Sequence, residues 1–326
     1  MRVSYSIRHN GSIVCATRAV APPFRRALLL GGLSAVAGFL ALGCGKPFRS
    51  TQQVSLTADV PSQRLRIQGT IGDVTVRAEP GATAVQATIT KVAHGSSQER
   101  ANEALDEIQV SFEMQGKDGT TVLAKSSHPQ TSATASYAVR WEVTAPPELT
   151  VEVEAAVGDV RVEGCTGKVS VAGGIGDVVV IGVKGSDASL GPVTITNEVG
   201  DVRVGQVTGE LRASTGIGSI RASAFGKVDL KTSVGDVRLR LLKGSSENVQ
   251  IRTSIGDIHV AMPEEWKGKV VADADIGSTS AHLGSLFMGS VRHHRHQFTA
   301  DVGDVSAPVL QAVTDVGDIF MRTYMP

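Results

Sequence analysis

The sequence has few aromatic residues. Phe, Trp and Tyr together make up 4% of the 326 residues, and Phe225 is the only one between Val151 and Met262. Sugar-binding grooves usually present aromatic platforms, and the residues that dominate protein interfaces are enriched in Trp and Tyr. This scarcity therefore argues against a sugar-binding groove or an aromatic hot spot along that stretch.

The signatures of common enzyme classes are also missing. The chain has no Gly-x-Ser-x-Gly, no His-Glu-x-x-His, no Walker loop and no Cys-x-x-Cys. We therefore predict that the protein has no catalytic residues and is not an enzyme. Because β-helix folds include polysaccharide-cleaving enzymes, a carbohydrate-active enzyme remains the alternative.

Acidic residues are absent from residues 1–43, which contain five arginines and an apolar run at residues 27–42. That run is shorter than the ~20 residues that a membrane-spanning helix needs, as in a secretory signal peptide. The segment Leu40-Ala41-Leu42-Gly43-Cys44 resembles a bacterial lipobox, although leucine is more usual at Ala41. This resemblance implies cleavage before Cys44 and a lipid on that residue. An ordinary signal peptide and an uncleaved anchor are the alternatives.

We accordingly expect residues 1–43 to be a signal peptide and residues 44–60 a tether. The protein would be exported and anchored to the bacterial cell membrane or outer membrane. Cys15 would be lost with the signal, so Cys165 would be the only thiol left and no intrachain disulfide would form. The expected mature chain has 27 basic and 32 acidic residues, a net charge of −5. This charge gives no reason to expect a nucleic acid as partner.

The strongest pattern is a repeated Ile/Val-Gly-Asp/Ser motif. From its second copy onward its glycines are 14 to 26 residues apart. Such a period is typical of repeat architectures, and glycine suits a tight corner that needs a positive φ. The motif glycines, which we predict to be structural turn residues, are Gly72, Gly158, Gly176, Gly200, Gly218, Gly235, Gly256, Gly277, Gly303 and Gly317.

Each repeat contains two short segments of alternating β-branched residues. In the first full repeat, residues 159–162 and 168–171 are of this kind, which predicts strands with one buried face. We place Val160, Val162, Val169 and Val171 inside. Since one coil cannot bury its valines alone, the repeats predict an all-β parallel β-solenoid (β-helix) over residues 151–326, of eight or nine coils. A compact β-sandwich is the alternative.

Residues 61–150 lack the regular repeat and are expected to form an N-terminal β-rich capping region. Ser96-Ser97-Gln98-Glu99 fits a capping box and predicts a short helix over residues 97–109. A solenoid needs covered ends, because open sheet edges pair with other chains. At the other end, we expect Phe320, Met321, Tyr324 and Met325 to cover the final coil.

The Ser-Ser-Gln-Glu helix, the Trp-Glu-Val-Thr-Ala-Pro strand and the serial Val-Gly-Asp-Val units resemble the bacterial envelope family called "putative adhesin". The resemblance covers about residues 60–320. It implies a domain of unknown function with a β-solenoid fold, often exported or membrane-anchored. It provides no catalytic residues.

The motif aspartates are expected to accept hydrogen bonds from turn backbone, and to pair with the arginine two residues later. One acidic group differs from this pattern. Two residues before the motif glycine, the last repeats carry Asp275, Asp301 and Asp315, and Asp304 and Asp318 follow the glycine. If these carboxylates stacked on adjacent coils, they would form a candidate Ca²⁺ site, although a solvated acidic edge is the simpler interpretation. No other cofactor is expected.

The sequence thus favours a lipid-anchored binding or structural module with an adhesin-like fold. Its partners would be the membrane, through the lipid, and a protein or surface component that the sequence does not identify. An envelope sensory or regulatory accessory protein is a further alternative.

Overall fold

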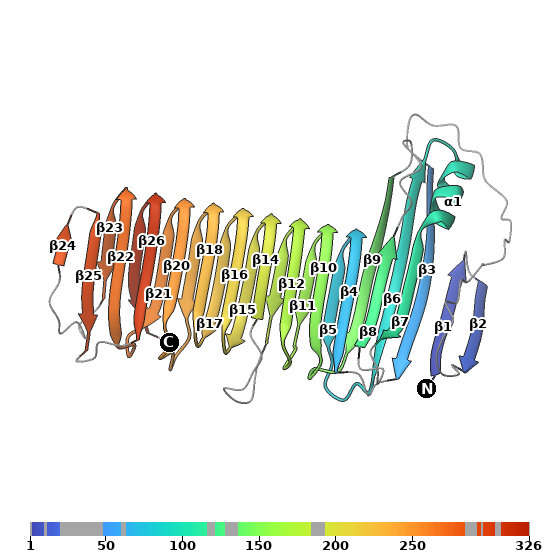
Figure 1. Ribbon diagram of the computed structural model, residues 1–326, viewed down its shortest axis with the longest axis horizontal. Coiled ribbons are helices and arrows are strands. Elements are labelled where there is room, and N and C mark those ends of the chain that lie inside the picture. Colours follow the sequence, from blue (N-terminus) through green and yellow to red (C-terminus); the bar gives the residue numbers. More distant parts are fainter. Residues whose placement is uncertain are drawn as a thin grey trace.

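The computed structural model describes residues 2–9, 12–19, 48–59, 63–115, 121–127, 136–183, 193–283, 292–294, 296–303 and 308–325. They form a long rod built from two facing sheets (Figure 1). The single helix of the described residues, α1 (Gln98–Glu107), has 10 residues. No helix in this part of the chain is long and apolar enough to span a membrane.

The first sheet has 14 strands. Their spatial order is β2 (Ser12–Ala19), β1 (Arg2–His9), β3 (Phe48–Asp59), β6 (Ala84–Gly95), β9 (Ser136–Ala145), β5 (Val74–Ala78), β11 (Val160–Glu163), β13 (Val178–Ile181), β15 (Val202–Thr208), β17 (Ile220–Phe225), β19 (Val237–Leu241), β21 (Ile258–Pro263), β27 (Ile319–Tyr324) and β23 (Thr279–His282).

The second sheet has 13 strands. Their spatial order is β24 (Arg292–His294), β25 (Gln297–Val302), β22 (Gly268–Ile276), β26 (Val309–Val316), β20 (Val249–Ile255), β18 (Val228–Val234), β16 (Leu211–Ile217), β14 (Val193–Val199), β12 (Val169–Ile175), β10 (Thr150–Val157), β4 (Arg64–Ile71), β8 (Thr121–Ser127) and β7 (Gln109–Gln115).

Nine coils make up the central part of the rod, each with one strand in either sheet. Neighbouring coils pair in parallel, as β10 does with β12 and β11 with β13. Val160, Val162, Val169 and Val171 are buried, with exposed fractions of 2% or less, whereas Arg161 is exposed. The predicted parallel β-solenoid and its inward face are therefore confirmed, and the sandwich alternative is wrong.

The solenoid begins earlier than the sequence analysis predicted. β4 and β5 pair in parallel with β10 and β11, so residues 64–78 form the first coil and not a part of the cap. Gly72 at the corner of this coil carries the first copy of the motif. The boundary expected at residue 151 was wrong because the capping segment is inserted after the first coil, where it interrupts the repeat in the sequence.

That inserted segment does cover the N-terminal end of the array. β9 pairs with β5 in one sheet and β8 with β4 in the other. Helix α1 lies on this end of the rod (Figure 1) and buries Ala101, Ala104 and Leu105. Its N-cap is Ser97, whose Oγ accepts a hydrogen bond from the backbone N–H of Arg100 at 3.2 Å. The helix lies within the predicted range of 97–109, but it begins one residue later and ends two residues earlier.

The segments before residue 60 also form strands. β3 pairs antiparallel with β6 over its whole length, so the tether expected at residues 44–60 was wrong for residues 48–59. β1 and β2 form a hairpin that extends the sheet beyond β3. Residues 20–47, including Cys44, lie outside the described residues. Removal of residues 1–43 stays a prediction, and it would leave β3 at the edge of the sheet.

At the C-terminal end, the order of the coils differs from their order in the sequence. The last coil, β26 and β27, lies between the coil of β20 and β21 and the coil of β22 and β23 (Figure 1). Phe320, Met321 and Tyr324 therefore belong to an interior coil, and the prediction that they cover the end was wrong. Instead, β25 pairs antiparallel with β22 and ends the second sheet together with β24.

Candidate functional site

The motif glycines stack in a ladder at one corner of the rod. Nine of the ten have a φ between +126° and +148°. A Cβ on Gly218 would lie 2.0 Å from the carbonyl oxygen of Gly200, and the other glycines that stack on a motif glycine are equally crowded. Gly303 does not belong to this ladder, because it follows the antiparallel strand β25 and faces the side chain of Lys267. At the other nine corners, close approach of the neighbouring coil adds to the requirement for a positive φ.

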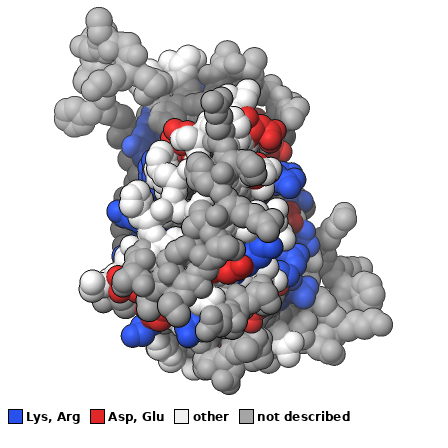
Figure 2. All heavy atoms as spheres, turned by 90° about the vertical axis from the view of Figure 1, so that its left-hand side faces the viewer, with Lys and Arg blue, Asp and Glu red and all other residues white. Residues whose placement is uncertain are grey.

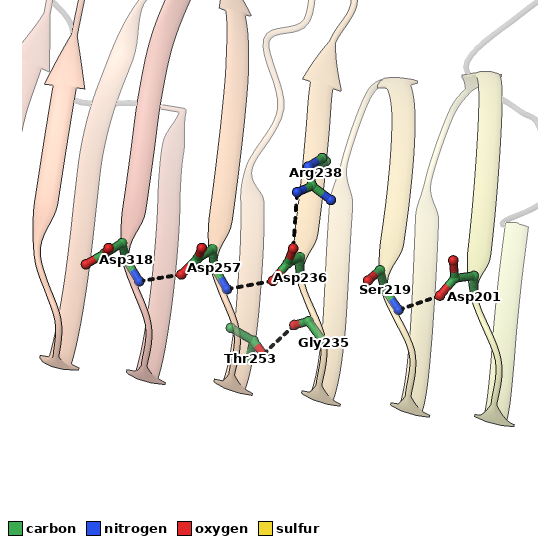
Figure 3. Close-up of polar contacts among 8 residues, drawn as sticks. All are labelled: Asp201, Ser219, Gly235, Asp236, Arg238, Thr253, Asp257 and Asp318. Atoms are coloured by element: carbon green, nitrogen blue, oxygen red, sulfur yellow. Dashed lines mark hydrogen bonds and ion pairs between the residues drawn. The ribbon is translucent and has the colours of Figure 1, made fainter.

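The motif aspartates form a second ladder beside the glycines. Each carboxylate accepts a hydrogen bond from the backbone N–H of the next coil, and not from its own turn. Figure 3 draws three of these bonds, from Ser219 to Asp201, from Asp257 to Asp236 and from Asp318 to Asp257. Their lengths are 2.9, 3.1 and 2.9 Å. The ladder continues to Ser278, whose N–H lies 2.7 Å from Asp318. These carboxylates therefore hold successive coils together.

A third ladder was not recognised in the sequence. Three residues before the glycine, a buried Thr hydroxyl donates to the carbonyl of the preceding motif glycine, as from Thr253 to Gly235 at 3.0 Å (Figure 3). Thr215, Thr232 and Thr314 make the same bond, and Asn197 makes it through its amide. The sequence does show a Thr that recurs three residues before the motif glycine. Because Thr is common in strands, this repetition did not indicate a hydrogen bond.

The first residue of the motif is exposed in eight of the ten copies, Ile71 and the buried Val302 being the exceptions. The eight side chains have exposed fractions from 39% to 66%, and the strand registers place them side by side along the corner. At ~4.8 Å per coil the row is roughly 35 Å long. We call it the aliphatic row; its members are Val157, Ile175, Val199, Ile217, Val234, Ile255, Val316 and Ile276.

The candidate Ca²⁺ residues are not brought together. Asp275 and Asp315 lie on adjacent coils, because Ala274 pairs with Thr314 and Ile276 with Val316. Asp301, however, is opposite Lys269, six residues from Asp275 and hence ~20 Å away along the strand. The expectation that these three stack was wrong, because β25 runs antiparallel. Asp318 belongs to the aspartate ladder, and Asp304 lies outside the described residues.

The predicted Asp–Arg pairs form in two of three coils. Arg238 lies 3.1 Å from Asp236 and Arg203 lies 3.9 Å from Asp201. Arg161 pairs with Glu163 and not with Asp159. All of these groups are partly exposed, so each pair contributes only a few tenths of a kcal/mol to about 1 kcal/mol.

Elsewhere, hydrogen bonds and burial shift the pKa values of a few groups. A hydrogen bond from Gln68 at 2.7 Å and another from Arg66 hold the pKa of the Glu154 carboxyl below its ordinary value. Arg212 does the same for the pKa of Glu210. Burial raises the pKa of the Cys165 thiol to about 11, which makes it unreactive at neutral pH.

The outer side of the first sheet is basic over its C-terminal half. Strands β15, β17, β19, β21, β27 and β23 contain no Asp or Glu. We call their outward side the cationic face; its charged and histidine residues are Arg203, Arg221, Arg238, Arg240, His259, Arg322 and His282. The end-on view of Figure 2 shows Lys and Arg side chains exposed on both flanks of the molecule, with Asp and Glu among them.

An open groove of about 840 Å³ lies on the cationic face. It is lined by residues from all six of these strands, among them Arg221, Arg240, His259, Phe320 and Arg322. The His259 and Phe320 rings stack with centroids 4.9 Å apart, and the Arg240 guanidinium lies 4.3 Å from the centre of the Tyr324 ring. Sequence reasoning missed this groove because β27 reaches it from the end of the chain.

A family model described as Toastrack DUF4097 matches residues 62–320. No curated protein matches the chain in sequence. The similar solved structures include a "putative adhesin" from Bacteroides fragilis, with 13% identity and a TM-score of 0.35, covering 83% of this chain and 97% of that one. Another is a "putative cell adhesion protein" from Clostridium sporogenes, with 11% identity and a TM-score of 0.27, covering 86% and 100% of the two chains.

Proposed function

The chain belongs to the Toastrack DUF4097 family, and from that premise we propose that it is a lipid-anchored module of the bacterial cell envelope that binds another envelope component without catalysing a reaction. The match agrees with the family resemblance found in the sequence. The family's own function is unknown, so the proposal depends on the surface of this chain.

The aliphatic row is the observation that supports a binding role. In the motif, glycine permits the corner and aspartate bonds the next coil, but the Ile or Val side chain at the exposed corner lies outside the buried core. Soluble monomers rarely expose continuous apolar surface over more than a few hundred Å², and larger patches mark sites of interaction. A row of eight aliphatic side chains along the rod is such a surface.

The binding role can be tested by making the aliphatic row polar. Ile175, Ile217 and Ile255 would be replaced by Thr, which keeps the β-branched shape that strands favour. In intact cells treated with a crosslinker, we expect the variant to lose crosslinked species that the unmodified chain forms. The matched control replaces Arg212, Lys231 and Arg252 with Thr on the second sheet. Unchanged crosslinking of a folded row variant would contradict the proposal.

The lipid anchor depends on Cys44 and is tested separately. We expect Cys44→Ser to abolish labelling by radioactive palmitate and to block normal signal cleavage, because the thiol is the site of acylation. Stable membrane attachment needs two acyl chains or more, which a lipidated cysteine supplies. A Cys15→Ser variant serves as the control and should still be labelled. Continued labelling of Cys44→Ser would show that the lipobox interpretation is wrong.

A further inference from the structure

The cationic face carries charge that the protein itself does not neutralise. Arg238 and Arg203 have the aspartate partners described above. Arg221, Arg240 and Arg322, by contrast, have no carboxylate within 4.0 Å in the described part of the chain. All three are exposed. Like charges on adjacent coils repel each other, so this arrangement costs stability unless an anion lies against it.

The positions of these groups are regular. The register pairs Arg203 with Arg221 and Arg221 with Arg238, so three arginines follow one another at ~4.8 Å along the rod. Arg240 also points outward, two residues after Arg238 on β19. In register with it, Ala261 of β21 and then Arg322 of β27 follow on the next two coils. A linear ligand lying parallel to the rod would meet about one guanidinium per coil.

We propose that the cationic face binds a linear polysaccharide that carries carboxylate groups, with its chain parallel to the rod. The five Lys or Arg positions of the cationic face are all arginine. Each guanidinium presents a planar pair of N–H donors that matches the two oxygens of a carboxylate. Four of the six coils carry at least one arginine, which gives a charge spacing along the rod close to one charge per sugar. The scarcity of aromatic residues argues against binding of sugars by ring stacking, whereas this face would bind them through charge. Its Phe320 and Tyr324 rings contact His259 and Arg240.

Other anionic partners fit this face less well. Single-stranded nucleic acid needs free aromatic rings on which bases stack, but the rings of Phe320 and Tyr324 are already covered by His259 and Arg240. Duplex DNA carries one charge per about 1.7 Å, which is far denser than one arginine per coil. A membrane surface is usually bound by several apolar side chains that insert among the lipids, and Phe225 and Phe320 are the only large exposed apolar residues on the six strands of the cationic face.

The test measures binding of the full chain, purified in detergent, to immobilised polygalacturonate at about 50 mM salt. We expect binding that weakens as salt increases, and no binding to uncharged dextran. The triple variant Arg221→Gln, Arg240→Gln and Arg322→Gln should bind at least about ten-fold more weakly. The matched control, Arg212→Gln, Lys231→Gln and Arg252→Gln, removes three charges from the second sheet and should bind as the unmodified chain does.

Three results would overturn the proposal. One is equal loss of binding in both triple variants, and another is no binding of polygalacturonate by the folded unmodified chain. The third is tighter binding to single-stranded DNA or to anionic lipid vesicles than to the polysaccharide. Melting curves establish that each variant is folded. The cationic face does not include the aliphatic row, so the Ile→Thr variant should retain polysaccharide binding, and each proposal can fail alone.

Discussion

At the scale of single residues, the corner glycines are held by two constraints at once. Gly218 has a φ of +148°, and a Cβ there would meet the Gly200 carbonyl oxygen at 2.0 Å. Any larger residue would strain its own backbone and also separate two coils. This is why the motif keeps glycine although glycine loses more conformational entropy on folding than any other residue.

Gly218→Ala should therefore destabilise the protein by about 3 kcal/mol or more, measured by urea unfolding. Gly205→Ala is the matched control in the neighbouring strand β15, where a Cβ would meet only the Ile181 side chain at 3.7 Å. That variant should leave stability unchanged or raise it by about 0.5 kcal/mol, because alanine restricts the unfolded chain. Similar losses for both variants would contradict the close packing at the corner.

Cys165 gives a second prediction at this scale. Its thiol is buried, and its pKa of about 11 leaves roughly one thiolate in a thousand at pH 8. In a chain carrying Cys15→Ser and Cys44→Ser, we expect Cys165 to resist a thiol reagent at pH 8. In denaturant, where the thiol regains its ordinary pKa, it should react within minutes. Rapid modification of the folded chain would show that this part of the core opens readily.

At the scale of secondary structure elements, the C-terminal coil is an interior element. β26 is paired on both sides, with β20 and β22, although it contains some of the last residues of the chain. Backbone groups paired on both sides exchange their protons only when neighbouring coils open. Position in the sequence therefore does not indicate local stability here.

Hydrogen exchange measured by mass spectrometry tests this order of coils. We expect the amides of β26 to exchange as slowly as those of β18, and the amides of β25 to exchange faster, because β25 lies near the edge beside the short strand β24. If β26 exchanged as fast as a frayed terminus while β22 stayed protected, the insertion of the last coil between β20 and β22 would be wrong.

At the scale of the whole molecule, the two sheets differ in charge. The second sheet mixes both signs and contains paired groups such as Arg66 with Glu154 and Arg212 with Glu210. The first sheet has the cationic face over its C-terminal half. A nearly neutral formal charge therefore hides a strong local asymmetry, which determines the sign of the ligands that each side attracts.

The paired carboxylates also predict how stability depends on pH. Because the folded protein lowers the pKa of Glu154 and Glu210, their contribution is present above the ordinary pKa of about 4.5 and is lost as the pH falls through the lower folded value. The double variant Glu154→Gln and Glu210→Gln should melt slightly below the unmodified chain at pH 7, and the difference should vanish near pH 3. Both groups are largely solvated, so the effect is small.

Glu247→Gln, at an exposed residue, is the control and should melt as the unmodified chain does at both pH values. A difference between the double variant and the unmodified chain that grew as the pH fell would contradict the assigned sign.

The sequence by itself determined the coil and its corner. Alternating valines specify which side of each strand is buried, and the motif glycine marks each corner, because both depend on residues within a single repeat. This is why Val160 and Val162 lie inside as predicted, and why nine of the ten glycines stack in one ladder. The capping helix was also predictable, since Ser97 and the apolar positions that follow are local signals.

Only the tertiary structure decided which coil lies next to which. Parallel strands pair through backbone groups that are the same in every repeat, so the motif of β26 and β27 fits equally well against several neighbours. The position of β27 beside β21 brought Phe320 and Arg322 into the groove with Arg240 and His259. The antiparallel pairing of β25 with β22 separated Asp301 from Asp275.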